Sequence, residues 1–305
     1  MASPDLNTAL GSLTLRSPLV AASGTVGSVW EWAEVADVSV FGAAVAKSVA
    51  PEPWPGLVAP RMAPIATGML NGIGIQNPGI SAWVEDMQPR IKKSKVPVWG
   101  SAVGGDPEGF AIVAKELSGA GVAAVEVNLS CPNLDDGAMF SFDAARSRSV
   151  IEAVVAATDL PVGAKLSPNT PDPVAVATAC IEAGANHLVL TNTALGFGVD
   201  TESRRPLISG AVGGYSGPGL KPLSLRCVYE VGRSLPGVPI VGCGGVATGR
   251  DVVEYLLAGA SAVAIGTTLL GEPKAGVRIR KELVAVMDRI GVERTGDLVG
   301  KVEPW

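Results

Sequence analysis

The sequence predicts an α/β protein folded as a (β/α)8 TIM barrel, and three observations favour this architecture. Eight apolar segments of about seven residues recur along the chain, and their continuous apolar and β-branched runs are typical of strands buried on both faces of a parallel sheet. Segments of helical character separate most of them. A weak internal repeat, GAGVAAVEV, EAGANHLVL and LAGASAVAI, places the same helix end, Gly-Ala turn and strand at three points. Eight such alternations in 305 residues fit a closed barrel.

The competing architecture is a doubly wound open sheet, which would carry a Gly-rich dinucleotide loop after its first strand. The first strand here is followed by GTVGSVWEW, which lacks the GxGxxG pattern. The expected strands cover residues 18–23, 43–49, 96–103, 123–130, 161–167, 187–193, 239–245 and 262–268. The expected helices include residues 107–121, 143–159, 172–185, 224–235 and 249–260. No linker-like or low-complexity segment divides the chain, so we expect a single domain over residues 1–305.

Composition excludes several classes of protein. The chain is 47% hydrophobic, which is enough apolar surface for a packed core. Its net charge of −5 argues against a nucleic-acid-binding surface. No run approaches the roughly 18 apolar residues of a membrane span, and the N-terminus lacks a signal-peptide pattern, so we expect a cytoplasmic protein. Cys131, Cys180, Cys227 and Cys243 form no CxxC pair, and His187 is the single histidine. No metal site is expected from this chain.

Two long loops rich in Gly and Pro follow predicted strands, at residues 50–79 and 194–221. Loops of this length in a compact domain are usually functional. In a barrel both would lie on the C-terminal face, where active sites form.

Polar groups cluster at the C-terminal ends of the predicted strands. They are Lys47, Ser48, Asn128, Ser130, Cys131, Lys165, Asn192, Thr193, Gly244, Gly245, Gly266 and Thr267. Backbone amides on Gly-rich turns after the seventh and eighth strands form the usual phosphate site of this fold, which suggests a phosphorylated ligand. A tight turn between strand and helix would explain Gly244 and Gly245 equally well.

Individual residues admit a functional and a structural interpretation. Lys165 lies inside an apolar run, where an unpaired ammonium would be costly, so we interpret it as functional. Cys131, in the stretch NLSCPN, is either a small packing residue or an acid–base thiol with a pKa near 8.5. We interpret His187 and the other cysteines as packing residues, and Arg204 and Arg205 as a solvated pair or a gate. Together these residues predict a site for a flat, anionic substrate beside a phosphorylated cofactor.

Several motifs resemble those of the class 1 dihydroorotate dehydrogenases. They are KS (47–48), NGIGIQNPG (71–79), NLSCPN (128–133), Lys165, TNT (191–193), DTESRRPLISGAVGGYSGPGLKP (200–222), GCGG (242–245) and GTT (266–268). The order and spacing agree from about Ser23 to Thr268. The resemblance implies an FMN-dependent (β/α)8 barrel enzyme that oxidises dihydroorotate to orotate in pyrimidine (UMP) biosynthesis.

The resemblance also assigns roles to residues. Cys131 would be the general base that takes the C5 proton, while the C6 hydride passes to flavin N5. The implied substrate-binding residues are Lys47, which would face the carboxylate, Asn71, Gly72, Ile73, Gly74, Ile75, Asn128, Asn133, Asn192 and Thr193. The implied FMN-binding residues are Ser23, Lys47, Ser48, Asn128, Lys165, Thr191, Gly217, Gly244, Gly245, Gly266 and Thr267. A cation at Lys165 would stabilise the reduced, anionic ring.

The subtype is implied by the same motifs. Class 2 members use Ser as base, so Cys131 favours class 1, and NGIGIQNPG resembles the 1B catalytic subunit. That type passes electrons to NAD⁺ through a partner subunit carrying FAD and a [2Fe–2S] cluster, in a heterotetramer. The 1A type, a homodimer that uses fumarate, is the alternative. Further alternatives are an FMN barrel acting on another dihydropyrimidine or on dihydrouridine, and a flavin-binding regulatory barrel without activity.

One position departs from the family pattern. After the third strand the family commonly places an Asn near the flavin, whereas this chain has Ser101 in VWGSAVGG. We expect a shorter hydroxyl contact there.

Overall fold

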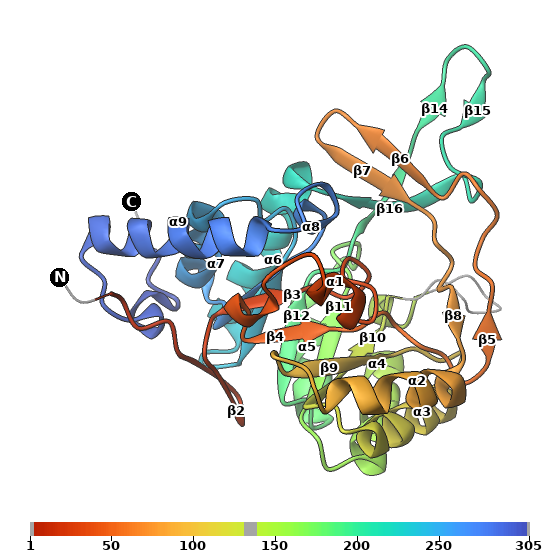
Figure 1. The fold of residues 1–305 in the computed structure, drawn as a ribbon, viewed down its shortest axis with the longest axis horizontal. Coiled ribbons are helices and arrows are strands. Elements are labelled where there is room, and N and C mark those ends of the chain that lie inside the picture. Colours follow the sequence, from red (N-terminus) through yellow and green to blue (C-terminus); the bar gives the residue numbers. More distant parts are fainter. Residues whose placement is uncertain (1–2, 131–138, 304–305) are drawn as a thin grey trace.

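The computed structural model describes residues 3–130 and 139–303, and a closed barrel of eight parallel strands lies at its centre (Figure 1). The strands follow one another around the barrel in chain order, and the last pairs with the first to close the ring. They are β3 (Leu19–Ala21), β4 (Ala43–Val45), β9 (Val98–Ala102), β10 (Ala124–Asn128), β11 (Val162–Leu166), β12 (His187–Leu190), β17 (Ile240–Cys243) and β18 (Ala262–Ile265). The predicted (β/α)8 barrel is therefore confirmed.

Helices surround the barrel. They are α1 (Trp30–Ala33), α2 (Ile80–Ile91), α3 (Pro107–Ala120), α4 (Ala144–Ala157), α5 (Pro173–Glu182), α6 (Lys221–Ser234), α7 (Gly249–Ala258), α8 (Thr268–Gly271) and α9 (Ala275–Ile290), with short 3-10 helices η1 (Val38–Val40), η2 (Phe140–Phe142), η3 (Pro218–Leu220) and η4 (Thr295–Leu298). The five predicted helices are all confirmed. Asp106, Asp143 and Asp172 cap three of them by accepting hydrogen bonds from first-turn amides. Among the helices of the described ranges, none is long and apolar enough to cross a bilayer.

Every predicted barrel strand overlaps an observed strand but extends beyond it. The segment predicted over residues 187–193, for example, is a strand only to Leu190. Beyond this point Thr191 still donates a backbone hydrogen bond to Cys243, although the regular ladder has ended. Composition does not mark where regular pairing stops, so the predicted ends were too long.

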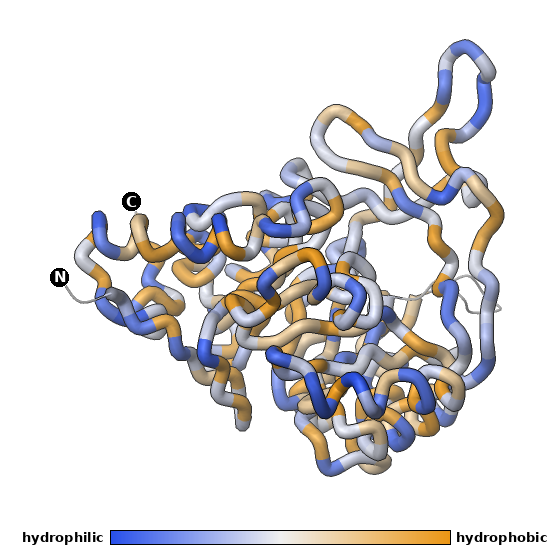
Figure 2. Tube along the Cα trace, viewed as in Figure 1, coloured by the Kyte–Doolittle hydropathy of each residue, from blue (hydrophilic) through white to orange (hydrophobic). Residues whose placement is uncertain are grey.

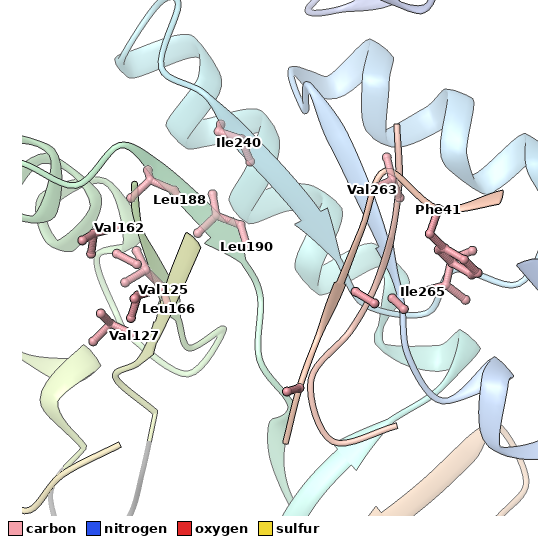
Figure 3. Close-up of a cluster of buried hydrophobic side chains, with 14 of the residues drawn as sticks. Phe41, Val125, Val127, Val162, Leu166, Leu188, Leu190, Ile240, Val263 and Ile265 are labelled. Atoms are coloured by element: carbon pink, nitrogen blue, oxygen red, sulfur yellow. The ribbon is translucent and has the colours of Figure 1, made fainter. Parts of the chain in front are cut away.

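Two layers of apolar side chains hold the barrel together. The outer layer packs the strands against the helices, and Figure 3 shows part of it, with Val125 and Val127 of β10 beside Leu166 of β11. The inner layer fills the barrel and includes Ala124 and Trp99. Because successive side chains in a strand point to opposite faces, residues 126 and 128 of β10 point into the barrel as well.

An N-terminal hairpin closes one end of the barrel. It consists of β1 (Thr8–Leu10) and β2 (Leu13–Leu15), which pair antiparallel. Leu10 and Leu15 are buried in the same cluster as the inward-facing strand residues. Polar side chains inside the barrel therefore open toward the opposite end, where the strands terminate.

The two long loops contain strands of their own. β6 (Met62–Ile65), β7 (Gly68–Asn71), β13 (Ala194–Phe197) and β16 (Val212–Ser216) form an antiparallel sheet in the order β13-β16-β7-β6, β5 (Pro53–Trp54) pairs with β8 (Asn77–Pro78), and β14 (Val199–Asp200) pairs with β15 (Arg205–Pro206). This part projects to one side of the barrel, and the tip of its β14–β15 hairpin is hydrophilic (Figures 1 and 2). Both loops leave the C-terminal ends of barrel strands, as predicted. Their many Gly and Pro residues concealed the strands.

His187 is a buried residue at the start of β12. Its Nδ1 lies 3.3 Å from Asn186 Oδ1, and its Nε2 has no hydrogen-bond partner among the described residues. Burial lowers the pKa of His187 to about 4. A neutral, packed imidazole agrees with the structural interpretation of this residue.

We predict that His187 makes the protein less stable in acid. In the unfolded chain its pKa is about 6.5. The unfolded state therefore binds an extra proton between about pH 6.5 and pH 4, and the free energy of unfolding falls by about 3 kcal/mol as the pH decreases through this window. Urea denaturation of the wild-type and His187→Gln proteins measures the effect. The stability difference between the two proteins should shrink toward pH 4, and a constant difference would contradict the prediction.

Candidate active site

Four polar side chains from four strand ends form a hydrogen-bonded row across the barrel mouth. Asn192 Nδ2 donates to Asn128 Oδ1 at 3.1 Å, and Asn128 Nδ2 donates to Ser48 Oγ at 3.4 Å. Ser48 Oγ lies 2.9 Å from Ser101 Oγ. Asn192 is fixed further because its Oδ1 accepts a hydrogen bond from the amide of Thr193 at 2.8 Å. The row fixes the orientation of two carboxamides, and carboxamides held in this way can hydrogen-bond to the edge of a flat polar ring.

Ser101 has a clear place in this row. Its side chain is fully buried, and its hydroxyl is joined to Ser48. The residue that replaces the common Asn of the family pattern therefore supports a neighbouring hydroxyl at the mouth. The predicted hydroxyl contact to a ligand stays a prediction.

A buried ion pair lies beneath the row. Lys165 of β11 is 5% exposed, and its Nζ lies 3.5 Å from Oε1 of Glu126 on β10, which is 2% exposed. Burial alone disfavours the charged amine, but the Glu126 charge counters it and the pKa of Lys165 is raised overall. Lys165 is therefore a cation at neutral pH. Glu126 was not among the predicted site residues, although a single acidic residue inside the apolar strand AVEVN was a usable signal.

The three described cysteines are buried packing residues. Burial raises the pKa of Cys227 and Cys243, and raises that of Cys180 to about 12. All three are neutral thiols at physiological pH. Cys131 and Asn133, the predicted base and its neighbour, lie outside the described residues.

Two turns after neighbouring strands offer unpaired backbone amides. Gly244 and Gly245 follow β17, and Gly266 and Thr267 follow β18. The amides of these four residues donate no hydrogen bond to another described residue. Gly245 has φ +69°, and a Cβ there would lie 2.7 Å from the amide nitrogen of Lys221, so the turn requires glycine. Unpaired amides on neighbouring Gly-rich turns can bind an anion, so these two turns are the candidate anion site.

The projecting sheet meets these turns. Thr267 Oγ1 donates to Ser216 Oγ at 2.8 Å, which ties β16 to the end of β18. The next residue, Gly217, has φ +106°, and a Cβ there would lie 2.5 Å from Gly68 Cα. A Cβ on Gly245 would lie 2.9 Å from the Gly217 carbonyl, so Gly217 lies next to the Gly244–Gly245 turn.

A buried network behind the first turn was not foreseen from the sequence. Tyr255 of α7 donates from its hydroxyl to the Gly244 carbonyl at 2.6 Å. Ser224 of α6 is fully buried, and its Oγ lies 2.7 Å from Thr191 Oγ1. A Cβ on Gly244 would come within 2.2 Å of Ser224 Oγ. Helices α6 and α7 therefore fix the turn and the predicted site residue Thr191 together.

A charged cluster holds the other side of the same turn. Lys221 Nζ lies 2.5 Å from Asp251 Oδ1 and 2.8 Å from Glu254 Oε2. Asp251 also accepts hydrogen bonds from the amides of Ala247 and Thr248. Although partial burial opposes its charge, these hydrogen bonds hold the pKa of Asp251 below its ordinary value. The cluster anchors the chain that leaves Gly245.

The predicted segment 71–75 borders the mouth. Asn71 ends β7, and its Nδ2 donates to the Gly214 carbonyl at 3.1 Å. Ile73 lines a groove that also includes Lys47 and Ser48. The remaining residues that connect β7 to β8 are Gly72, Gly74, Ile75 and Gln76.

Two further groups of hydrogen bonds fix predicted site residues. Ser23 Oγ donates to the Ala46 carbonyl at 3.0 Å, next to Lys47 in the chain. Asn169, which was not among the predicted site residues, donates to the Thr193 carbonyl at 3.3 Å and accepts from the Leu195 amide at 2.8 Å. Asn169 therefore holds the loop that carries Asn192.

This set of donors fits a phosphorylated cofactor with a polar ring, as FMN is. The unpaired amides suit its phosphate, and the Lys165 cation suits a ring that becomes negative on reduction. No group of three or more His, Cys, Asp or Glu side chains able to hold a metal ion occurs within residues 3–130 and 139–303.

Comparison with known proteins supports the resemblance drawn from the motifs. The family model described as dihydroorotate dehydrogenase matches residues 5–287. A protein of Geobacter sp. (strain M21) named "Dihydroorotate dehydrogenase B (NAD(+)), catalytic subunit" is 40% identical over 305 residues, covering 99% of this chain and 100% of its own. Proteins of the same name from Desulforudis audaxviator (40% over 294 residues; 96% of this chain, 95% of theirs) and Alkaliphilus oremlandii (37% over 294; 96% and 97%) are also similar. The chain belongs to the dihydroorotate dehydrogenase family.

Proposed function

We propose that this chain is an FMN-dependent dehydrogenase that oxidises dihydroorotate to orotate in pyrimidine biosynthesis. The observation that carries the proposal is a set of three features at the C-terminal strand ends of one barrel: a buried lysine cation, a row of carboxamides and two turns of unpaired amides. Family membership supports the substrate, which is a flat ring with amide edges and a carboxylate. The site offers donors and acceptors for such a ring and a separate anion site for the cofactor.

The cofactor would be held by residues of seven barrel strand ends and the projecting sheet. They are Ser23, Lys47, Ser48, Asn128, Lys165, Thr191, Gly217, Gly244, Gly245, Gly266 and Thr267. The Gly turns would bind the phosphate through backbone amides. Bound FMN supplies a ring that accepts a hydride. Lys165 would counter the negative charge gained in that event.

The substrate would be held at the carboxamide row and the 71–75 segment. The proposed residues are Lys47, Asn71, Gly72, Ile73, Gly74, Ile75, Asn128, Asn133, Asn192 and Thr193. Asn128 and Asn192 each carry a donor and an acceptor, which match the alternating N–H and C=O groups of a pyrimidine ring. Lys47 would pair with the carboxylate.

Cys131 would take the proton from substrate C5. A thiol with a pKa near 8.5 needs little activation to act as a base near neutral pH. The family resemblance is the basis of this assignment, and the other three cysteines are buried neutral thiols that do not compete for the role.

A partner subunit would carry electrons away. The relatives named above are catalytic subunits of an NAD⁺ enzyme, which supports NAD⁺ as final acceptor and a separate electron-transfer protein. We propose that FAD and a [2Fe–2S] cluster reside in that partner, and that this chain forms a homodimer within a heterotetramer.

The first test is spectroscopic. Purified protein should be yellow with bound FMN, and anaerobic dihydroorotate should bleach it, whereas dihydrouracil, which lacks the carboxylate, should not. The bleached protein should reduce NAD⁺ only after an iron–sulfur flavoprotein partner is added. A colourless protein that binds no added FMN would contradict the proposal, and direct reduction of fumarate would assign the 1A type.

Replacing Cys131 tests the proposed base. Cys131→Ala should keep FMN but slow flavin reduction by dihydroorotate by roughly 10²–10⁴-fold, the usual contribution of a positioned base. Stopped-flow absorbance measures the rate. Cys180→Ala on α5 is the matched control and should reduce at the wild-type rate. An unchanged rate in Cys131→Ala would remove this residue from its role.

The anion site is tested at Gly245. In Gly245→Ala the new Cβ would lie 2.7 Å from the Lys221 amide nitrogen and 2.9 Å from the Gly217 carbonyl, so the turn must move. We expect the dissociation constant of FMN, measured by fluorescence quenching with apoprotein, to rise at least about tenfold. Gly237→Ala has a similar positive φ of 82° but no atom within 4 Å of its Cβ. This control should lose about 1 kcal/mol of stability without a change in FMN affinity. Equal affinities in the two variants would contradict the assignment.

A further inference from the structure

Glu126 is a buried carboxylate that belongs to neither the proposed substrate-binding nor the proposed cofactor-binding residues. It is 2% exposed, and its Oε1 lies 3.5 Å from Lys165 Nζ. The same oxygen has no hydrogen-bond partner among the described residues. The contact that Glu126 makes through this atom is therefore electrostatic and is directed at Lys165.

The strand register places Glu126 deeper in the barrel than Lys165. Asn128 of β10 pairs with Lys165 of β11, whereas Glu126 pairs with Gly163, two residues earlier. Glu126 is thus one inward-facing step below the carboxamide row. The Lys165 cation lies nearer the mouth, with the carboxylate behind it.

Stability alone gives no reason for this pair. Two buried charges cost desolvation energy, and apolar residues of similar size often stabilise a protein as well or better. Among the described residues, Cys243 also acts on both charges, and burial keeps it neutral by raising its pKa. A charged pair kept inside an apolar barrel at the mouth is instead typical of a functional site.

We propose that Glu126 is a positioning residue that holds the Lys165 ammonium at the barrel mouth and moderates its positive field, so that bound FMN is harder to reduce than beside an unpaired lysine. The inference rests on the proposed function, because it requires FMN at this mouth. It goes beyond that function by assigning control of the flavin potential to a residue that would touch neither cofactor nor substrate.

The midpoint potential of bound FMN tests the proposal. Glu126→Gln keeps the side-chain shape and removes the negative charge, so the field of Lys165 should favour reduced, anionic FMN more strongly. Between pH 6 and 7, the variant should prefer reduced over oxidised FMN at least about tenfold more strongly than the wild type does. For a two-electron couple this corresponds to a rise of about 30 mV in the midpoint potential. At higher pH the potential of the variant should fall more steeply than that of the wild type, because Lys165, now without its partner, would take up a proton on reduction.

A double-mutant cycle separates this role from a structural one. In the Lys165→Met background, Glu126→Gln should leave the potential unchanged, because a buried carboxylate that has lost its counter-charge is neutralised and has no charge left to remove. Glu126→Asp should lie between the wild type and Glu126→Gln. Glu182→Gln, which removes a carboxylate from an exposed pair with Arg148 on the outer helices, is the matched control and should have the wild-type potential.

Three outcomes would overturn the inference. They are an unchanged potential in folded Glu126→Gln protein, an equal shift in the two lysine backgrounds, and an equal shift in Glu182→Gln. If Glu126→Gln does not fold, Glu126→Asp in the wild-type and Lys165→Met backgrounds gives the same comparison, with a smaller rise expected only where the lysine is present. Failure of the wild-type protein to bind FMN would instead refute the proposed function and the inference with it.

Discussion

The parallel closure of the barrel is the constraint on which the candidate site depends. Because all eight strands run in one direction, their C-terminal ends meet at one mouth. Asn128, Lys165 and Asn192, which are far apart in the sequence, are brought together by this pairing and not by the loops that follow them. The N-terminal hairpin fills the other end of the barrel with leucines, so a ligand can reach polar groups inside the barrel only from the C-terminal mouth.

The barrel and much of the mouth could be predicted from the sequence because their signals are local. A strand buried on both faces is a continuous apolar run, and its exit is marked by a change to polar residues or glycine. Asn128 and Gly244 were found by this change, and Lys165 by the cost of an unpaired ammonium inside an apolar run. The family resemblance, which the comparisons confirm, then assigned roles that composition and spacing had left open. The single domain, the cytoplasmic location and the roles of individual residues stay predictions.

The features that sequence reasoning missed depend on contacts between distant segments. Glu126 is recognised as part of the site only through its ion pair with Lys165 on the next strand. Tyr255 is recognised only through its hydrogen bond to the Gly244 carbonyl. The four-stranded sheet needs two loops more than 100 residues apart to pair, as Asn71 does with Gly214. No periodicity within one loop can reveal such pairing. Gly and Pro, which mark turns, occur in these strands as well and hide them further.

The barrel interior changes from apolar to polar along its axis, and the charged pair lies at the boundary. Trp99 and Ala124 belong to the apolar interior, and Asn128 lies at the mouth. A charge placed deeper would be desolvated without reaching a ligand, and one placed further out would be screened by water. Lys165 lies between these limits, in register with Asn128 at the mouth and buried enough for the low dielectric to strengthen its field. A buried counter-charge raises the pKa of such a cation against the effect of desolvation, which gives the acidic residue of an otherwise apolar strand a physical role.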